Sequence, residues 1–479
     1  MSRNVQEFRG LAADSREVKP GFLFAALAGS KTDGAKFIAD AVARGAVAVL
    51  GAPDIAAQVN ALGVEFIQAA NPRRRLSLMA AEFYGAQPSV VAAVTGTNGK
   101  TSVACFVRQI WAYEGTAAAS LGTIGIDAPS GHVSLEHTTP DPVRLHAELA
   151  RLKAEGVDHL AMEASSHGLD QYRLDGVNVS VAGFTNITRD HLDYHATFEN
   201  YLAAKLRLFR DLVVPGGAAV VNVDAEGAEH FVAVAKTRGL KLLRVGLNGE
   251  ELRLLSQTPS ERGQDIVVGY EGREHKIALP LAGLFQASNA LVAAGLVLAL
   301  GDPAEKVFAA LETLKGAPGR LELVARTRAQ AAIFVDYAHT PDAIETVLKA
   351  LRPHVKGRLH ILFGCGGDRD RGKRPLMAQA AARFADSVII TDDNPRSEDP
   401  AAIRREALAG APTATEITGR AEAIAQAVAA LQENDALVIA GKGHEDYQII
   451  GGDVLHFSDR EEAVKAARAL GGSAAGGSA

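Results

Sequence analysis

The chain has 479 residues, of which 47% are hydrophobic and 22% charged, and its formal net charge is −6. At about 150 residues per domain this length predicts two to four globular domains, and the acidic balance offers no basic footprint for nucleic acid. Two widely separated cysteines exclude a disulfide framework or a cysteine metal site. The polar N-terminus is not a secretion signal, and the longest apolar run, residues 290–300, is too short to cross a bilayer. We therefore expect a cytoplasmic protein without membrane insertion.

Three blocks and a tail follow one another along the chain. Residues 1–87 hold short strand and helix signals, and residues 88–318 alternate apolar strands with helical patterns. Residues 319–470 repeat that alternation, and the Gly-, Ser- and Ala-rich residues 471–479 are typical of a flexible tail. Strands that alternate with helices predict mostly parallel sheets covered by helices, hence an α/β fold with three domains, the last of them Rossmann-like. Ligands bind such sheets at the carboxyl ends of the strands.

The strongest motif is VVAAVTGTNGKTSVACF, residues 90–106, in which an apolar strand leads into a glycine-rich loop and a helix. Glycines let backbone N–H groups approach phosphate oxygens, and a helix N-terminus favours an anion. Lys100 would reach the β- and γ-phosphates, and Thr101 would place its hydroxyl on Mg²⁺. Val94 stands where the common phosphate-binding loop has its first glycine, but the strand–loop–helix context still predicts nucleotide binding.

Polar clusters follow two further strands of this block. Glu163 ends an apolar strand, where a carboxylate can hold the Mg²⁺ of a nucleotide, and the following loop is rich in hydrogen-bonding side chains. The motif TNITRDHLDYH, residues 185–195, comes after the next strand and before a helix that carries Lys205. On spacing alone the first cluster is also typical of a solvated turn, and Lys205 of an exposed helix face.

The third block has polar clusters of both charge signs after its strands. Asp336 ends one strand and could accept hydrogen bonds from a ribose. The stretches 363–377 and 439–450 are glycine-rich and carry basic and acidic side chains, and the stretch 389–400 adds acids and an arginine. A rim of both charge signs suits a zwitterionic ligand such as an amino acid. The middle stretch, IITDDNPRSEDP, is equally typical of a turn in which Ser397 or Asp399 is the N-cap of a helix that begins at Pro400.

The motifs TGTNGKTS, EASSHGL, TNITRDHLDYH, AAKLRLF, DYAHTPDA and GKGHED resemble, in order and across nearly the whole chain, the sequence blocks of the Mur ligase family. These enzymes form amide bonds in peptidoglycan synthesis with ATP. The motif DNPR, residues 393–396, is similar to that of members that add meso-2,6-diaminopimelate to UDP-MurNAc-L-Ala-D-Glu. The resemblance implies a UDP-sugar-binding N-terminal domain, a central ATPase domain and a C-terminal amino-acid-binding domain. It also implies a monomeric, Mg²⁺-dependent enzyme that serves cell-wall biogenesis, cell shape and cell division.

The resemblance assigns site residues by motif. The UDP-MurNAc-dipeptide would be bound by Ser15, Ser30, Lys31, Thr32, Thr138, Thr139, Ser165, Gln171 and Arg173. ATP would lie on Gly96, Thr97, Asn98, Gly99, Lys100, Thr101 and Ser102, with Asn289, Arg320 and Asp336. The metal ions would be served by Thr101, Glu163, His191 and Lys205, the last as carbamylated N6-carboxylysine, and the catalytic residues would be Lys100, Glu163, His191 and Lys205. Diaminopimelate would be bound by Arg369, Asp393, Asn394, Pro395, Arg396, Gly441 and Glu445.

The implied reaction activates the D-Glu side-chain carboxylate as an acyl phosphate, which the amine of the amino acid then attacks. The alternatives are an L-lysine-adding ligase, a folylpolyglutamate-type ligase of the same fold, and a P-loop NTPase switch. The motif HTTPD, residues 137–141, and DNPR argue against the folylpolyglutamate type. DAEG at 224–227 matches a loose switch motif, but SKTD at 30–33 precedes the phosphate-binding loop, which is the wrong order for a GTPase.

Overall fold

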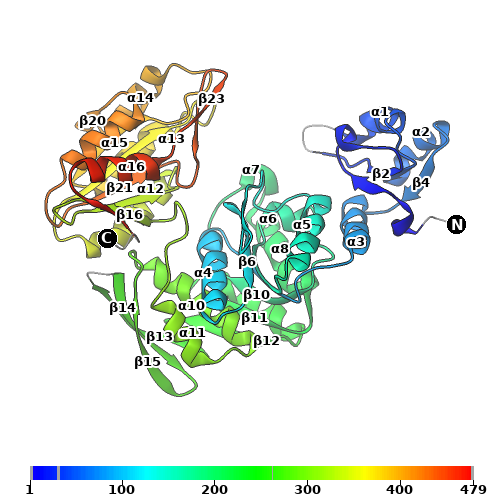
Figure 1. Ribbon diagram of the computed structural model, residues 1–479, viewed down its shortest axis with the longest axis horizontal. Helices are drawn as coiled ribbons and strands as arrows, with labels where there is room; N and C mark the ends of the chain where they lie inside the picture. The colour runs from blue at the N-terminus through cyan, green and yellow to red at the C-terminus, as the bar shows by residue number, and fades with distance from the viewer. Residues whose placement is uncertain (1–3, 30–32, 261–262, 476–479) are drawn as a thin grey trace. The chain divides into compact units, whose positions relative to one another are not determined.

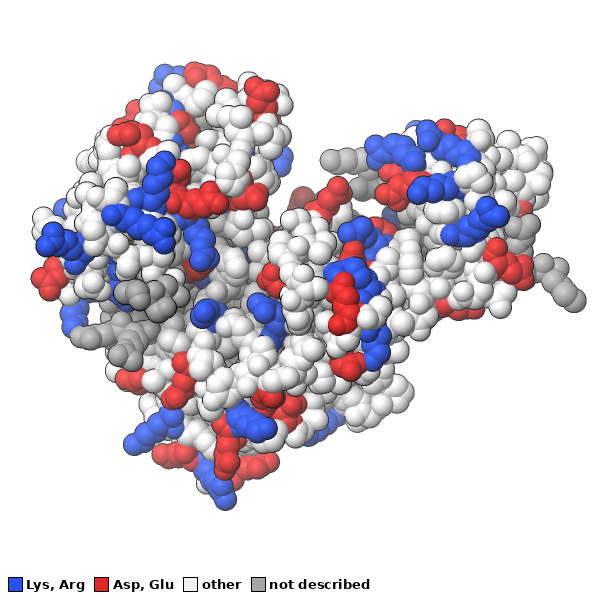
Figure 2. All heavy atoms as spheres, viewed as in Figure 1, with Lys and Arg blue, Asp and Glu red and all other residues white. Residues whose placement is uncertain are grey.

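The computed structural model describes residues 4–29, 33–260 and 263–475 (Figure 1). The chain forms two compact units, Met1–Arg253 with Leu291–Ala310 and Leu254–Ala290 with Leu311–Ala479. A small sheet and most of a larger one belong to the first unit, and a third sheet and a separate two-stranded hairpin belong to the second. Basic and acidic side chains are interspersed on the face drawn in Figure 2.

A small parallel sheet forms the N-terminal part of the first unit. Its strands alternate between two cores: Leu23 and Ala25 point to one face, and Phe24 points to the other. This period of two lets helices cover both faces of the sheet. The strands, in hydrogen-bonded order, are β1 (Gly10–Ala12), β2 (Phe22–Ala25), β3 (Ala48–Gly51) and β4 (Glu65–Gln68), and the helices are α1 (Ile38–Ala43), α2 (Ala56–Ala61) and α3 (Pro72–Tyr84).

The larger sheet of the first unit carries the predicted phosphate-binding loop. In the part of this sheet that belongs to the first unit, neighbouring strands from β12 to β6 are all parallel and the edge strands β6–β7–β8 are antiparallel, which confirms the prediction of a mostly parallel sheet. The order is β12 (Lys241–Gly246), β11 (Val213–Asn222), β10 (Val179–Phe184), β5 (Val90–Thr95), β9 (His159–Glu163), β6 (Ala118–Gly122), β7 (Gly125–Ala128) and β8 (Gly131–Val133).

Helices cover both faces of this sheet. On β10, a Cβ at Gly183 would meet Leu296 of α10, whereas the ring of Phe184 stacks on Phe231 of α9 at 3.8 Å. The apolar run at 290–300 therefore lies in a buried part of helix α10. The helices are α4 (Lys100–Tyr113), α5 (Pro142–Ala154), α6 (Ser166–Asp170), α7 (Leu192–His195), α8 (Phe198–Arg207), α9 (Ala228–Thr237), α10 (Phe285–Leu300) and α11 (Ala304–Leu311). No helix in the described part of the chain is long and apolar enough to span a membrane.

The second unit is built on a sheet whose central strands are parallel. Ile361 and Phe363 of β18 face a core with α12 to α14, while Leu362 faces a core with α15 and α16. The order is β20 (Thr415–Glu416), β19 (Ser387–Asp392), β18 (Leu359–Cys365), β21 (Ala436–Ala440), β17 (Ala332–Asp336), β16 (Glu322–Arg326) and β24 (Ser473–Ala474). The helices are α12 (Pro341–Leu351), α13 (Lys373–Phe384), α14 (Pro400–Leu408), α15 (Arg420–Ala429) and α16 (Asp459–Ala469).

Two features differ from the boundaries expected from the sequence. Strand β13 (Leu252–Ser260) begins beside β12, but the hairpin β14 (Gly263–Tyr270) and β15 (Arg273–Leu279) groups with the second unit, well before residue 319. The predicted flexible tail begins with ordered residues, because Ser473 and Ala474 pair with β16 through backbone hydrogen bonds. A second hairpin, β22 (Tyr447–Ile450) and β23 (Asp453–His456), begins within the stretch 439–450, which the sequence predicts as part of the ligand rim.

Candidate active site

The phosphate-binding loop lies between β5 and α4, as its motif predicts. Gly99 has a φ of +85°, a left-handed conformation that favours glycine, and α4 begins at the next residue, Lys100. A Cβ at Gly96 would lie 1.9 Å from Thr185 Oγ1, so only glycine fits there. Lys100 Nζ donates to the carbonyls of Gly96 at 3.0 Å and Thr97 at 2.9 Å, which folds its side chain over the loop. Thr101 and Ser102 are buried in the first helical turn.

Residues after β10 hold this loop in place. Because β10 pairs with β5, the start of the TNITRDHLDYH motif comes beside the loop. Thr97 N–H donates to the Asn186 carbonyl at 2.8 Å, and Asn98 N–H donates to Asn186 Oδ1 at 3.0 Å. Thr97 Oγ1 also lies 3.0 Å from the hydroxyl of Tyr201, a buried residue that the sequence analysis did not single out.

Lys205 lies against the same loop. Its Nζ donates to the Gly96 carbonyl at 2.7 Å, and the residue is only 1% exposed. The reading of Lys205 as part of a solvated helix face is therefore wrong. Burial, with the nearby Lys100 charge, lowers the pKa of Lys205 well below its usual value.

A chain of hydroxyl groups surrounds the end of β9. Glu163 is 1% exposed, and its carboxylate accepts hydrogen bonds from the Thr123 N–H at 2.7 Å and the Thr123 hydroxyl at 3.2 Å. Thr123 Oγ1 lies 3.0 Å from Thr138 Oγ1, and Thr139 Oγ1 lies 3.0 Å from Ser165 Oγ. Thr123 was not predicted as a site residue. The only signal for it in the sequence is a hydroxyl-bearing residue directly after a strand.

The remaining predicted dipeptide residues of the central part join this network. Arg173 Nη1 donates to the Thr139 carbonyl at 2.6 Å, and its Nη2 donates to Gln171 Oε1 at 2.8 Å. Gln171 Nε2 in turn donates to the Tyr194 hydroxyl at 3.0 Å. Thr138, Thr139, Ser165, Gln171 and Arg173 thus lie together at the sheet edge that carries Glu163.

The predicted residues of the N-terminal part are only partly described. Ser15 is buried and hydrogen bonds to Asp40, whose pKa it lowers. The predicted residues Ser30, Lys31 and Thr32 lie outside the described residues.

His191, the predicted metal-binding histidine, lies at the N-terminus of α7 with its side chain half exposed. Its ring centroid is 4.8 Å from that of His167, whose pKa burial and the neighbouring histidines lower to about 4. Within the described ranges, no group of three or more His, Cys, Asp or Glu is arranged to hold a metal ion. Mg²⁺ commonly takes one or two protein ligands and completes its shell with phosphate oxygens and water. The hydroxyl of Thr101 and the carboxylate of Glu163 have the oxygen chemistry that such binding needs.

In the second unit, the three residues predicted to complete the ATP site are linked. Asp336 is buried and accepts backbone hydrogen bonds from Leu321 at 2.6 Å and Ala338 at 2.7 Å. Asn289 Nδ2 donates to Gln286 Oε1 at 3.0 Å, and Gln286 Nε2 donates to the Arg320 carbonyl at 3.3 Å. Burial raises the pKa of Asp336, and the Arg320 charge partly offsets that rise. Gln286 was not predicted from the sequence.

The DNPR motif lies at the carboxyl end of β19, next to the end of β21. A Cβ at Gly441 would lie 3.0 Å from Asp393 Oδ2. Asn394 Nδ2 donates to Glu445 Oε2 at 3.4 Å, and Asn394 Oδ1 accepts from the buried Lys442 Nζ at 3.4 Å. Burial raises the pKa of Glu445, against the opposing effect of Lys442. These residues form a rim with both charge signs, as predicted.

Two arginines of the predicted set flank a glycine after β18. Arg396 Nη1 donates to the Gly367 carbonyl at 2.8 Å. A Cβ at Gly366 would lie 2.9 Å from Arg396 Nη1 and 3.6 Å from Arg369 Cγ. Pro395, between Asn394 and Arg396, is buried. The two guanidinium-bearing chains therefore lie near each other on the rim.

Arg420 binds the ends of the strands that carry this rim, and the sequence did not predict this role. It is fully buried, donates to Asp459 and to the carbonyls of Asp392 and Ala440, and lies 3.9 Å from Asp393 Oδ2. Its acceptors are the ends of β19 and β21 and the start of α16, so it joins three elements.

The helix-start interpretation of IITDDNPRSEDP also holds. Asp399 is the N-cap of α14, and its side chain accepts a hydrogen bond from the Ala401 N–H. Ser397, the other candidate cap, instead hydrogen bonds to Asp368. The stretch therefore combines a helix cap with a charged rim.

The chain is similar to known proteins over nearly its whole length. Residues 7–84 match the model of the Mur ligase family, catalytic domain, residues 94–297 match the Mur ligase middle domain, and residues 319–443 match the Mur ligase, glutamate ligase domain. UDP-N-acetylmuramoyl-L-alanyl-D-glutamate--2,6-diaminopimelate ligases from Bradyrhizobium diazoefficiens and Caulobacter vibrioides are 57% and 54% identical. These alignments cover 97% and 95% of this chain, and 95% of each relative.

Solved structures agree with this similarity. A structure of a UDP-N-acetylmuramoyl-L-alanyl-D-glutamate--2,6-diaminopimelate ligase matches with a TM-score of 0.72 and 35% identity, over 96% of this chain and 95% of that one. The MurF ligase from Thermotoga maritima in complex with ADP shares the fold at a TM-score of 0.63 and 16% identity, over 98% and 99% of the two chains. From its three matched domains and its full-length relatives, we conclude that the chain belongs to the Mur ligase family.

Proposed function

We propose that this chain is the ATP-dependent ligase that joins meso-2,6-diaminopimelate to the D-Glu side-chain carboxylate of UDP-MurNAc-L-Ala-D-Glu. The observation that carries the proposal is the shared sheet edge of the first unit, where Lys100 and Lys205 reach Gly96 and the Glu163 to Arg173 network begins one strand away. Relatives that bear the name of this activity are 50–57% identical over nearly the whole chain.

The reaction needs two steps because a carboxylate is a poor acyl donor. The D-Glu carboxylate attacks the γ-phosphate of ATP, which gives an acyl phosphate and ADP. The amine of diaminopimelate then attacks the acyl carbon, the amide forms, and phosphate leaves with the electron pair of the broken C–O bond. No covalent protein nucleophile is required.

Residues of the first unit would supply orientation and charge. Lys100 would offset negative charge on the transferring phosphoryl group, and Gln171 and Arg173 would hold the dipeptide so that its carboxylate meets the γ-phosphate. Thr101 and Glu163, with His191, would hold Mg²⁺, which when bound neutralises charge on the phosphate oxygens.

Lys205 would act as a carbamate. A neutral lysine amine adds CO₂ and releases a proton, which gives an anion able to support a metal ion where an ordinary lysine carries a positive charge. The 1% exposure of Lys205 and its position against Gly96 O support this role. Intact mass measured under neutral conditions, with and without bicarbonate, would show the gain of one CO₂, and Lys205→Arg would abolish it.

The rim of the second unit would select the amino acid. Diaminopimelate carries one more carboxylate than lysine, at its far centre, and Arg396 can hold a carboxylate with its planar fork. Asp393 and Glu445 would face the ammonium group of the same centre, with Arg369, Asn394, Pro395 and Gly441 shaping the rim. In the same way Asn289, Arg320 and Asp336 would contact the nucleotide, and Ser15 the UDP-sugar.

Phosphate release from ATP tests the proposal. We expect release only when Mg²⁺, UDP-MurNAc-L-Ala-D-Glu and meso-diaminopimelate are all present, with L-lysine and other diaminopimelate stereoisomers as competing amino acids. Release from ATP alone would favour a P-loop switch, and a preference for L-lysine would favour the lysine-adding ligase. We expect a monomer in the cytoplasm, and light scattering at working concentration checks the monomer.

A further inference from the structure

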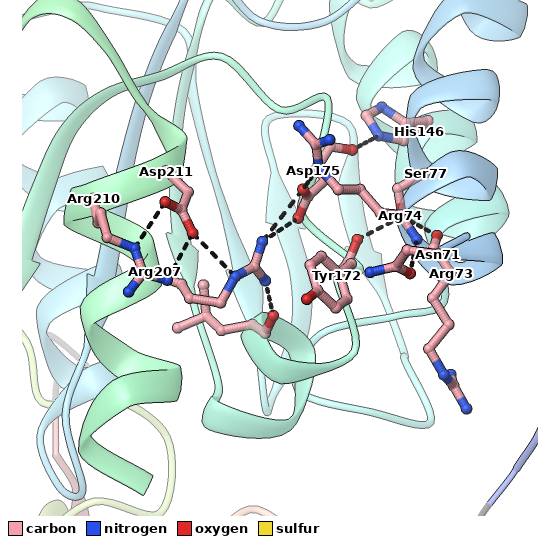
Figure 3. A network of polar contacts seen from close by, with 11 residues as sticks. Asn71, Arg73, Arg74, Ser77, His146, Tyr172, Asp175, Arg207, Arg210 and Asp211 are labelled. Carbon is pink, nitrogen blue, oxygen red and sulfur yellow. Dashed lines mark hydrogen bonds and ion pairs between the residues drawn. The ribbon is translucent and has the colours of Figure 1, made fainter. Parts of the chain in front are cut away.

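A buried ion pair between Arg207 of α8 and Asp175 lies next to the dipeptide network (Figure 3). Arg207 Nη2 lies 3.0 Å from Asp175 Oδ2, and the two side chains are 10% and 5% exposed. Arg207 also donates to the Leu169 carbonyl and, through Nε, to Asp211 Oδ2 at 3.2 Å. Its guanidinium carbon lies 4.0 Å from the ring centroid of Tyr172. The planar guanidinium of Arg207 thus contacts several groups at once in a fixed geometry, which the compact ammonium of a lysine cannot reproduce.

Arg207 contacts the Leu169 carbonyl, the Tyr172 ring and Asp175, and all three lie in one turn. We call this turn, residues 169–175, the dipeptide turn. This turn also carries Gln171 and Arg173, two of the residues expected to hold the substrate. Tyr172 has a φ of +59°, an uncommon and strained conformation for an aromatic residue. A strained turn keeps its shape only where its surroundings hold it, and Arg207 contacts it at both ends and at its centre.

The helix that carries Arg207 is held on its other side by the phosphate-binding loop. Lys205 and Arg207 are two residues apart on α8, so their side chains leave opposite sides of the helix at about 100° per residue. Lys205 points to Gly96 O, and Arg207 points to the dipeptide turn. Helix α8 therefore links the phosphate end of the site to its dipeptide end, and a short π-helix, Leu208–Leu212, follows directly.

Helix α3, the last helix of the N-terminal sheet region, also contacts the dipeptide turn. In Figure 3, Arg74 and Ser77 of α3 reach the turn from the side opposite Arg207. Arg74 Nε donates to Asp175 Oδ1 at 2.9 Å, and Ser77 Oγ donates to the Tyr172 carbonyl at 2.5 Å. Asp175 therefore accepts hydrogen bonds from one arginine of α3 and one arginine of α8, and its carboxylate links the two helices.

We propose that Arg207 is a positioning residue for the ligase reaction. Through Asp175 and the dipeptide turn, it fixes Gln171 and Arg173 relative to Lys205 and the phosphate-binding loop. The inference rests on the proposed function. The carboxylate and the γ-phosphate must come within about 3–3.5 Å to react, and a misplacement of about 1 Å costs about 100-fold in rate. Loosening the turn would therefore lower kcat without removing any group that touches a substrate.

Kinetics of three variants test the proposal. Arg207→Met keeps the volume but removes every hydrogen bond, and Arg207→Lys keeps the charge but loses the fork. Arg244→Met is the matched control, since Arg244 of β12 pairs with Glu250 and Glu251 in the loop after that strand, away from α8 and the dipeptide turn. We expect Arg207→Met to lower kcat by about 100-fold and to raise the KM for the UDP-dipeptide, while the KM for diaminopimelate stays within about twofold. Arg207→Lys should be intermediate, and the control should match the native enzyme.

The outcomes separate positioning from plain stability. Assays are run below the unfolding temperature of each variant. If Arg207→Met loses thermal stability but keeps the native kcat and KM values, the pair is structural only and the proposal is overturned. Where Arg207→Met does not fold, Arg207→Lys decides in the same way, because native constants in that variant overturn the proposal.

A second measurement does not depend on activity. Hydrogen exchange of the segment 165–176 should quicken in Arg207→Lys and stay native in Arg244→Met, and an unchanged rate in Arg207→Lys overturns the proposal. If the native enzyme itself releases no phosphate with all substrates, the proposed function fails, and hydrogen exchange still decides whether Arg207 fixes the turn.

Discussion

Removing the guanidinium of Arg396 should change the preference between two amino acids. In the proposed complex this group faces the far carboxylate of diaminopimelate, which L-lysine lacks. A hydrogen bond to a charged group in a desolvated site contributes about 1.5–3 kcal/mol, which corresponds to about 10- to 150-fold in KM. Arg396→Ala should therefore raise the KM for diaminopimelate by that factor. The kcat/KM for L-lysine and the KM for ATP should stay within about threefold.

The assay is phosphate release with saturating ATP and UDP-dipeptide and varied amino acid. Arg371→Ala is the matched control, because Arg371 stands in the same loop as Arg369 but is 68% exposed and pairs with Glu406 on the surface. Such a surface pair contributes about 0–1 kcal/mol, so the control should behave as the native enzyme. Equal increases in the KM for diaminopimelate and for ATP, or an unchanged ratio of diaminopimelate to lysine, would refute the assignment of Arg396.

Three further perturbations test other parts of the structure. Gly96→Ala would place a Cβ 1.9 Å from Thr185 Oγ1, so it should cost about 1–3 kcal/mol of overpacking and raise the KM for ATP at least about tenfold. Arg420→Met leaves a buried carboxylate without its main partner and should lower the free energy of unfolding by about 3–5 kcal/mol. Burial and a hydrogen bond with Asp302 raise the pKa of Glu114 to about 7 from 4.5. The protonated form is the one favoured by folding, so its contribution is full below about pH 4.5 and is lost as pH rises through about 7; Tm should fall over that window.

Each of these predictions has an outcome that would contradict it, and two of them have a control variant. Gly115→Ala is the control for Gly96→Ala, since nothing lies within 4 Å of a Cβ at Gly115, and a native KM for ATP in Gly96→Ala would contradict the steric argument. If unfolding of Arg420→Met in guanidinium chloride shows no loss of stability, the buried pair contributes nothing to the free energy of unfolding. Glu114→Gln should flatten the pH dependence of Tm, and an unchanged slope in that variant would assign the dependence to other groups.

Local patterns were enough to predict much of this protein. The α/β alternation, the glycine-rich loop between β5 and α4 and the helix that begins at Pro400 all depend on residues that are neighbours in sequence, so a short stretch contains the information. Strand-end clusters were predictable for a related reason. In a parallel sheet the carboxyl ends of all strands share one edge, and Glu163 and the 185–188 loop therefore had to lie near the loop after β5.

The partners of single buried side chains could not be predicted in this way. Lys205 was indistinguishable by spacing from a residue on an exposed helix face, because its partner, Gly96 O, lies 109 residues earlier. Arg420 bonds to Asp459 across 39 residues, and Arg207 to Asp175 across 32. No local propensity distinguishes such an arginine from one on the surface.

The sequence by itself therefore determined which segments form strands, helices and ligand loops, because hydrophobic period, glycine and capping residues act over a few positions. Only the tertiary structure decided which charged side chains are buried and what they hold. Burying a charge is unfavourable unless a partner is in place, and the partner is supplied by an element that the fold, and not the local sequence, brings alongside. Arg207, which lies on the same helix as Lys205 and binds Asp175 of the dipeptide turn, is one such residue.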